Sequence, residues 1–447
     1  MGSSYPSKAI VERWQLLVHV CRRWRTLVFG SPRRLHLRLC CTAETPVRAA
    51  LHIWPPLPLI VEGIVTTSGM SNIIAALGKS HRVRRVHLQL EDRQLEQVLA
   101  AMQVSFPELT DLQLASRFTT LRPIPDSFLD GSAPRLQSFR LDGIPSPFPG
   151  LIKLLSSATR LVCLALNHMP QSGCIPPEAM VALVTTLPNL GTLSLGFYYP
   201  PFYAGRQRQS LTPPTRAILP ALETLNFNGV TEYLEDLVTI IDTPQLCKIY
   251  ITFLEQFKYD CPRLAQFVNR TPKLRAPDKA YMRFDQGTKA SVILRYTSLN
   301  DLRIDISCTH PSWRLSSVEQ ICSSSLLQPH STVTNLYIER EHWNSELIWE
   351  VDEEEDAPWF QLLLPFTAVI NLYICAEFAP GIADTLRELV EGEQTEVLPS
   401  LRSIFVEPLE LSRPFEESIG QFAAVRRSSG HPIDISDWDK DSYMMSR

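Results

Sequence analysis

One six-residue pattern recurs through most of this chain and limits the folds that it can adopt. An apolar residue is followed by two others, a second apolar residue, one other and a third apolar residue, as in LTDLQL from Leu109. Eleven copies begin at Val83, Leu109, Leu136, Leu161, Leu190, Leu222, Leu246, Leu299, Val333, Val369 and Leu401. They lie about 24 to 36 residues apart, except for one wide gap that contains TPKLRAP, which we interpret as a degenerate copy. Self-similarity at this period predicts stacked repeats.

Each copy has the properties of a short strand with one buried face. The second and third apolar residues alternate with others and so point to one side, while the first lies at the turn into the strand. Segments with helical spacing lie between copies, at 94–104, 176–187, 231–241 and 381–392. One strand and helix cannot bury their apolar faces alone, so neighbouring units must stack. The predicted fold class is an α/β solenoid with parallel strands on the concave face and helices on the convex face.

The alternative is chance recurrence of leucines in a doubly wound α/β sheet. No G-x-G-x-x-G or P-loop follows any predicted strand, so the usual nucleotide-binding function of such a sheet has no support. Residues 83 to about 410 instead resemble leucine-rich repeats, whose pattern is L-x-x-L-x-L-x-x-N/C-x-L. The chain matches the three leading apolar positions and has neither Asn nor Cys at the ninth. Without an asparagine ladder at the convex turn, we expect an irregular leucine-rich-repeat solenoid.

Composition restricts the partners and the compartment. The chain of 447 residues has a formal net charge of −4, so no nucleic-acid partner is predicted. No apolar run approaches the roughly 18 residues that span a bilayer, and the amino-terminal residues have no apolar signal segment. Ten scattered cysteines without a C-x-x-C pair are typical of reduced thiols in an intracellular protein. We therefore expect a cytoplasmic or nuclear protein with no membrane partner.

The segment KAIVERWQLLVHVCRRWRTLVF, residues 8–29, reads as one helix with a single apolar stripe. Gly30 and Pro32 end it, and LHLRL follows as a strand. One interpretation is a capping helix for the first repeat, which a solenoid end requires. Another is a phosphate-contacting patch formed by Arg22, Arg23 and Arg25, although no basic-aromatic groove accompanies them.

A third interpretation comes from resemblance. The run W-x-x-L-x-x-V-C-R-R-W-R-x-L-V with SPRRLHLRL resembles the second half of an F-box, and residues 45–63 resemble the segment that follows it in mushroom-type fungal F-box proteins with leucine-rich repeats. The resemblance implies a helical module that binds the Skp-type adaptor of a cullin-RING ubiquitin ligase, while the repeats bind a protein substrate. Its adaptor-facing or internal packing positions would be Trp14, Leu17, Val20, Cys21, Trp24 and Leu27. The usual opening L-P-x-E segment does not precede these residues, so the F-box is expected to be partial. Either the gene model has lost its first exon, or the protein is a truncated relative with weak or no adaptor binding.

No catalytic constellation is evident, so the chain is predicted not to be an enzyme and to hold no cofactor or metal. His52 and His168 are better explained as structural or surface residues. The aromatic insertion at 196–216 is the candidate substrate-binding site, through residues expected to be exposed: Phe197, Tyr198, Tyr199, Phe202 and Tyr203. The alternative is that this insertion packs onto the solenoid flank. The acidic run at 349–360 reads as a solvated loop or a contact for a basic substrate.

These observations divide the chain into five segments. A partial F-box occupies 1–39, and a connecting segment at 40–82 is expected to pack on the first repeat. The solenoid follows at 83–411, with a capping helix at 412–430 and a frayed, flexible tail at 431–447. The predicted function is the substrate-recognition subunit of a ubiquitin ligase. The alternative is a leucine-rich-repeat scaffold that binds a protein without recruiting a ligase.

Overall fold

The computed structural model describes residues 13–30, 37–116, 123–145, 150–170, 173–198, 216–254, 259, 261–285, 289–296, 300–308, 313–323, 332–340, 359–391, 397–407 and 413–438. The chain divides into two compact units. The first comprises Met1–Thr212 with Ala217–Leu222, and the second comprises Pro213–Arg216 with Glu223–Arg447. None of the described helices is both long enough and apolar enough to cross a membrane.

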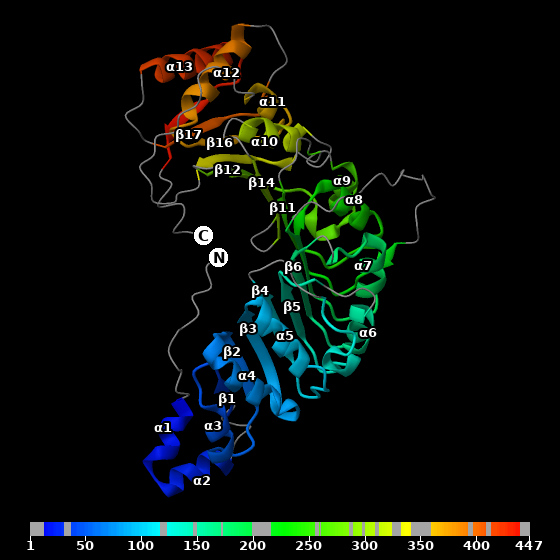
Figure 1. The fold of residues 1–447 in the computed structure, drawn as a ribbon. Coiled ribbons are helices and arrows are strands. Elements are labelled where there is room, and N and C mark those ends of the chain that lie inside the picture. The colour runs from blue at the N-terminus through cyan, green and yellow to red at the C-terminus, as the bar shows by residue number, and fades with distance from the viewer. Residues whose placement is uncertain are drawn as a thin grey trace. The chain divides into compact units, whose positions relative to one another are not determined.

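The first unit contains a parallel sheet in which strand order follows chain order. Its strands are β1 (Leu39–Cys41), β2 (Leu59–Ile64), β3 (Val83–Leu90), β4 (Asp111–Ser116), β5 (Ser138–Asp142), β6 (Cys163–Met169) and β7 (Thr192–Phe197), with the short β8 (Ala217–Ile218) outside this series. The helices are α1 (Arg13–Val20), α2 (Arg22–Gly30), α3 (Val47–Ile53), α4 (Met70–Leu77), α5 (Asp92–Ala101), α6 (Gly150–Ser157) and α7 (Pro177–Val184), with 3₁₀ turns η1 (Thr67–Gly69), η2 (Ser80–Arg82) and η3 (Phe128–Gly131). Helices α6 and α7 lie along one side of β5 and β6 (Figure 1).

The second unit continues the alternation of strands and helices. Its strands are β9 (Thr224–Gly229), β10 (Ile241–Asp242), β11 (Lys248–Phe253), β12 (Lys279–Phe284), β13 (Lys289–Arg295), β14 (Asp301–Ser307), β15 (Asn335–Arg340), β16 (Asn371–Ile374), β17 (Ser403–Val406) and β18 (Asp434–Asp437). Its helices are α8 (Thr231–Thr239), α9 (Pro262–Arg270), α10 (Trp313–Ser323), α11 (Trp359–Leu363), α12 (Ala379–Glu391) and α13 (Arg413–Ser428), with the 3₁₀ turn η5 (Pro272–Leu274). The main sheet has the order β9-β11-β14-β13-β12-β15-β16-β17-β18.

All eleven sequence repeats form strands with the predicted alternation. In β4, Leu112 and Leu114 are buried while Gln113 between them is half-buried. The first apolar residue of most copies closes a turn by donating its backbone N–H to a carbonyl three residues earlier, as Leu109 does to Phe106 at 3.2 Å. Leu274 makes the same bond to Thr271 at 3.1 Å, so TPKLRAP begins a degenerate copy as predicted. The fold class is therefore an irregular α/β solenoid of leucine-rich-repeat type.

The wide gap after Leu246 contains an insertion into this regular series. Strand β12 follows the degenerate copy, but β13 pairs antiparallel with both β12 and β14. As a result β11 lies beside β14, and parallel order resumes between β12 and β15. The sheet of the second unit is thus mixed, which the repeat pattern did not predict.

The series of strands also extends beyond both predicted boundaries. Residues 40–82, predicted as a connecting segment, contribute most of β1, all of β2 and helices α3 and α4, so the parallel sheet begins at Leu39 and not at Val83. The prediction of a frayed tail is wrong for residues 434–437, because β18 pairs parallel with β17. A helix, α13, forms within the segment predicted as a cap, and Gly430 follows it with a φ of +81°, but β18 comes after this helix in the chain and pairs with β17.

An aromatic ladder covers the face opposite the helices at the carboxyl end of the second unit. Tyr281, Tyr337, Tyr373 and Phe405 occupy one register row, and successive ring centroids are 4.5, 4.3 and 4.6 Å apart in stacked geometry. Trp438 follows β18 and is buried. The centroid of its ring lies 5.5 Å from that of Tyr373 and 6.1 Å from that of Tyr337. Aromatic rings of neighbouring repeats therefore join the last strands together.

Candidate interaction surfaces

Helices α1 and α2 meet at a bend at Cys21 (Figure 1), and we call this bent pair of helices the hook. One side of it packs on the start of the solenoid: Val18 and Val28 form a buried cluster with Leu37 and Leu57, and Leu17, Phe29 and Trp54 border this cluster. The ring of Phe29 lies edge-on to that of Trp54, with centroids 6.3 Å apart. The hook is therefore anchored to the solenoid by apolar burial, as a cap would be.

The prediction of one continuous helix over 8–29 is wrong for the residues that the structure describes. The chain leaves helical geometry at Cys21, between α1 and α2. This break lets Val18 and Val28 converge on the same cluster, which a straight helix would not allow. The Nε of Arg25 donates a hydrogen bond to the carbonyl of Val18 at 3.1 Å and so links the two helices across the break. Burial against Leu37 and Leu57, far away in sequence, selects the bent form.

The outer side of the hook is apolar and faces solvent. Val20, Trp24 and Leu27 are 65%, 46% and 62% exposed, and Leu16 is similarly exposed. Cys21 is exposed as well. Single exposed apolar residues are ordinary, but several within two adjacent short helices are typical of an interaction surface.

The predicted adaptor residues that the structure describes differ in exposure. Val20, Cys21, Trp24 and Leu27 lie exposed on the outer side. Leu17 is half-buried and packs toward the solenoid, so it is an internal position. The side chain of Trp14 lies outside what the structure describes.

The predicted aromatic substrate site is only partly within the described residues. Phe197 was expected to be exposed, and this is wrong: it ends β7 and is buried, because its position in the strand faces the core. Tyr198, the next residue, is 49% exposed, and its ring centroid lies 6.4 Å from that of His168. Tyr199, Phe202 and Tyr203 lie outside the described residues. Of the acidic run, Trp359 and Phe360 are described, and Trp359 is buried against Phe284 and Phe378 at the start of α11.

A polar group lies near Tyr198 on the first unit. Nδ1 of His168 is 2.6 Å from Oδ1 of Asp142, and this hydrogen bond raises the pKa of the imidazole despite partial burial. Asn167 accepts a hydrogen bond from the Ser194 hydroxyl at 2.8 Å. These contacts run between neighbouring strands, so they are consistent with the structural or surface role expected for His168.

Three potential metal ligands meet in the second unit. The ligand atoms of Cys375, Glu377 and Glu407 all lie within 4.8 Å of one another. However, Glu377 accepts a hydrogen bond from Nη1 of Arg340 at 2.6 Å, and the backbone N–H of Arg340 donates to the Cys375 sulfur at 3.4 Å. The arginine already supplies a positive charge here, so the cluster is explained by protein contacts.

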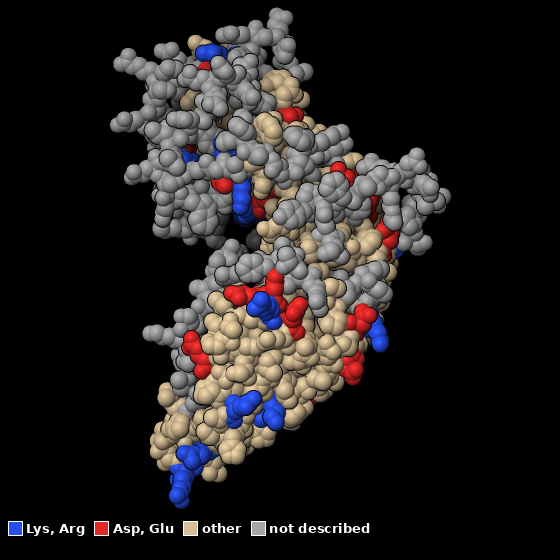
Figure 2. Space-filling view, viewed as in Figure 1, with Lys and Arg blue, Asp and Glu red and all other residues tan. Residues whose placement is uncertain are grey.

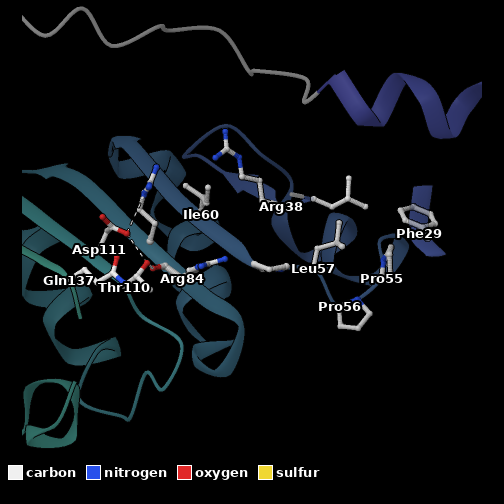
Figure 3. Close-up of a pocket in the computed structure, with 13 residues that line it drawn as sticks. Phe29, Arg38, Pro55, Pro56, Leu57, Ile60, Arg84, Thr110, Asp111 and Gln137 are labelled. Carbon is white, nitrogen blue, oxygen red and sulfur yellow. Dashed lines mark hydrogen bonds and ion pairs between the residues drawn. The ribbon is translucent and has the colours of Figure 1, made fainter. Parts of the chain in front are cut away.

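A groove lies beside the hook, at the amino ends of strands β1 to β5. It has a volume of about 850 Å³ and is lined by Phe29, Leu37, Arg38, Pro55, Pro56, Leu57, Pro58, Ile60, Arg84, Arg85, Thr110, Asp111 and Gln137 (Figure 3). Sequence reasoning missed it, because segments that lie far apart in the sequence, including the end of α2 and the start of β3, converge to form it. The available signals were the cluster of prolines at 55–58 and the arginine pair in the copy VRRVHL.

Comparisons with known proteins include a distant similarity to a solved structure. No family model matches the chain, and no curated protein matches it. Among solved structures, the leucine-rich repeat-containing protein LegL7 from Legionella pneumophila matches 87% of this chain and 98% of its own, with 12% sequence identity and a TM-score of 0.30. At that TM-score we draw nothing from the match, and the repeat fold rests on the strand pairing described above.

Proposed function

We propose that this protein recognises other proteins through its repeat solenoid and that the hook recruits a Skp-type adaptor. The protein would then act, in the cytoplasm or nucleus, as the F-box-like substrate receptor of a cullin-RING ubiquitin ligase. In this role it is not an enzyme. It needs no cofactor, because other subunits carry the chemistry and the receptor supplies proximity. Its partners are the adaptor and a protein substrate.

The observation that supports this proposal is the two-sided hook. Its inner side is fixed on the solenoid through Val18 and Val28, while Val20, Trp24 and Leu27 face outward. A helix that served only as a cap would place its apolar residues inward and polar residues outward. The exposed tryptophan and leucine are instead the residue types that anchor a helical module on a partner, with tryptophan favoured as a hot spot.

A second candidate is a repeat scaffold that binds a protein without a ligase. The packing of Val18 and Val28 against Leu37 and Leu57 favours this scaffold, because that packing alone gives the hook a structural role. The two candidates share the solenoid and differ in whether the outer side binds an adaptor.

A pull-down of the full chain by purified Skp-type adaptor tests the proposal. We expect the wild type to bind and the double variant Trp24→Ala, Leu27→Ala to weaken binding by about 30-fold, the effect of losing roughly 2 kcal/mol at a hot spot. Both side chains are exposed, so folding should persist, as circular dichroism would verify.

The matched control is Ile53→Ala with Val104→Ala, which removes two exposed apolar side chains outside the hook. This control should bind like the wild type. If the wild type does not bind, or if the control loses as much as the hook variant, the adaptor proposal is wrong and the scaffold is favoured.

A further inference from the structure

Strand β18 is the last strand of the sheet in the second unit, and its outer edge is open. It pairs with β17 on one side and has no second neighbour among the described strands. Its four residues, Asp434, Ile435, Ser436 and Asp437, are all exposed, and Ile435 is exposed to 44%. An unpaired strand edge is a template on which another chain can add a strand.

The pairing with β17 fixes which backbone groups lie on the open edge. Asp434 donates its N–H to the carbonyl of Arg402 at 2.9 Å, and Trp438 donates its N–H to a carbonyl of β17 at 2.7 Å. Backbone groups of successive residues in a strand point to opposite sides, so the N–H and C=O groups of Ile435 and Asp437 point away from β17. These two residues therefore present donors and acceptors for a further strand.

The first strand of the first unit differs from this edge. Strand β1 has only three residues, and Leu39 and Cys41 in it are buried. Leu37, just before β1, belongs to the buried cluster that anchors the hook. A solenoid requires a cover at its ends. The hook packs beside the first strand, whereas β18 ends the second unit with its side chains exposed.

The side chains of β18 select the charge of a partner strand. Asp434 and Asp437 are its two charged residues, and neither forms an ion pair within the part of the chain that the structure describes. Pairing of β18 with β18 of a second copy would place four carboxylates on two adjacent strands that contain no basic residue. Like charges on neighbouring strands are destabilising, and opposite charges are favourable. The edge therefore disfavours self-association and favours a basic strand.

We propose that β18 binds an extended basic segment of a partner protein as an added strand. Side chains that lie beside each other on neighbouring strands share a face of the sheet. Basic residues three positions apart would thus lie beside Asp434 and Asp437, and an apolar residue would lie beside Ile435. Ile435 is in register with Ile404 of β17, which is buried in the core, so this apolar residue would extend the core by one strand. In such strand addition the main-chain hydrogen bonds supply affinity and the side chains supply specificity.

A protein segment fits this edge better than a nucleic acid does, because two carboxylates repel phosphates. On the face seen in Figure 2, described Lys and Arg residues occur in small groups and not as one continuous basic surface, so that face offers a polyanion no broad site. The inference gives the substrate of the proposed function a chemical class. It rests on that function for this consequence, whereas binding at β18 does not require the adaptor.

Fluorescence anisotropy with the full chain tests the edge. The probe is a fluorescein-labelled peptide Thr-Lys-Val-Val-Lys-Thr, in which the lysines have the required spacing in either strand direction. We expect binding that weakens with salt and is lost when glutamates replace the lysines. Two further peptides carry N-methyl groups on alternate residues in opposite phases. One phase should lose binding and the other should keep it, because alternate N–H groups of an added strand face β18. If the two phases behave alike, no strand is added and the proposal is overturned.

Charge reversal on the protein tests the carboxylates. Asp434→Lys with Asp437→Lys should weaken peptide binding about tenfold or more. The matched control is Glu44→Lys with Asp126→Lys, two exposed acids in turns outside β18 that make the same change in net charge. This control should keep peptide affinity within about twofold. An equal loss in the control variant would overturn the proposal.

A second pair of variants tests the backbone. Ile435→Pro removes the N–H on the open side without removing a hydrogen bond to β17, which an edge strand tolerates, and it should weaken binding about tenfold. Ile435→Ala keeps that N–H and should weaken binding a few-fold at most. Hydrogen exchange in β17 verifies that β18 stays paired in both variants. If the proline variant then binds like the alanine variant, the open edge is not used and the proposal is wrong.

The same variants separate this proposal from the adaptor proposal. Asp434→Lys with Asp437→Lys should still be pulled down by the adaptor, and Trp24→Ala with Leu27→Ala should still bind the peptide. Peptide binding without adaptor binding refutes the adaptor proposal alone. Adaptor binding without binding of the basic peptide refutes the β18 proposal alone.

Discussion

Glu235 provides the sharpest test of how neighbouring repeats hold one another in the second unit. It lies buried on α8, and its two carboxylate oxygens accept backbone N–H groups from the next helix, α9: Arg263 at 2.9 Å and Leu264 at 2.7 Å. These N–H groups are in the first turn of α9, where no intrahelical acceptor exists. The carboxylate therefore caps a helix from a different repeat and also places a negative charge at its positive end.

The cost of Glu235→Ala follows from these contacts. Two buried N–H groups lose their acceptors, at about 1 to 2 kcal/mol each, and the favourable charge at the helix end contributes about 0.5 to 1 kcal/mol more. Relief of the buried carboxylate from desolvation offsets part of this. We expect a net loss of about 2 to 3 kcal/mol. Glu235→Gln keeps one oxygen acceptor and should lose about half as much.

Urea unfolding by circular dichroism, together with hydrogen exchange of a peptide covering α9, measures this effect. The local readout matters because a repeat array need not unfold in one step. Glu232→Ala is the matched control, since Glu232 is an exposed acid on the same helix, and it should shift neither readout by more than a few tenths of a kcal/mol. The reasoning is refuted if Glu235→Ala unfolds like this control or if exchange in α9 is unchanged.

Two further predictions concern the buried Trp438 and the pair formed by His168 and Asp142. Trp438→Ala should destabilise the last strands by about 3 kcal/mol, because it removes a buried indole that packs against Tyr337 and Tyr373. Hydrogen exchange in β17 should then become faster, and unchanged exchange there would contradict this prediction. Because the hydrogen bond to Asp142 raises the pKa of His168, the pair should stabilise the fold fully below the unfolded pKa of histidine, near 6.5, and lose that stabilisation as pH rises through the raised folded value. Asp142→Asn should therefore lower the melting temperature more at pH 5.5 than at pH 8.5. The difference should be small, because both side chains are about half exposed. An equal decrease at both pH values would count against this explanation.

The repeats were predictable because the information that forms them is local. Each copy contains, within six positions, a first apolar residue that closes a turn and two further apolar residues that point inward. Each copy therefore predicts its own strand. Strand β18 lacks this signal: its sequence DISD has one apolar residue, Ile435, which is exposed, and its place is fixed by pairing with β17 and by burial of Trp438. Strand β2 reads LIVEGI, a run in which buried residues are adjacent and do not alternate.

The rest of the fold and the sites depend on contacts between distant segments. The bend at Cys21 is selected by Leu37 and Leu57, and the insertion of β13 by pairing with β12 and β14. Leu17 and Trp24 have the same apolar character in the sequence, and only packing shows that one faces the solenoid and the other faces solvent. The groove was not predictable for the same reason, since its lining comes from segments that meet only in the folded chain.

The aromatic ladder has an optical consequence. Its rings are stacked with interplanar angles of 15°, 10° and 9°, so their electronic transitions are coupled and should give a near-ultraviolet circular dichroism signal. Trp438 lies against two of these tyrosines and can accept their excitation energy, so light absorbed by Tyr337 or Tyr373 should reappear as tryptophan emission. The last turn of this solenoid therefore contains its own spectroscopic reporter, whose signal depends on whether the carboxyl-terminal strand is in place.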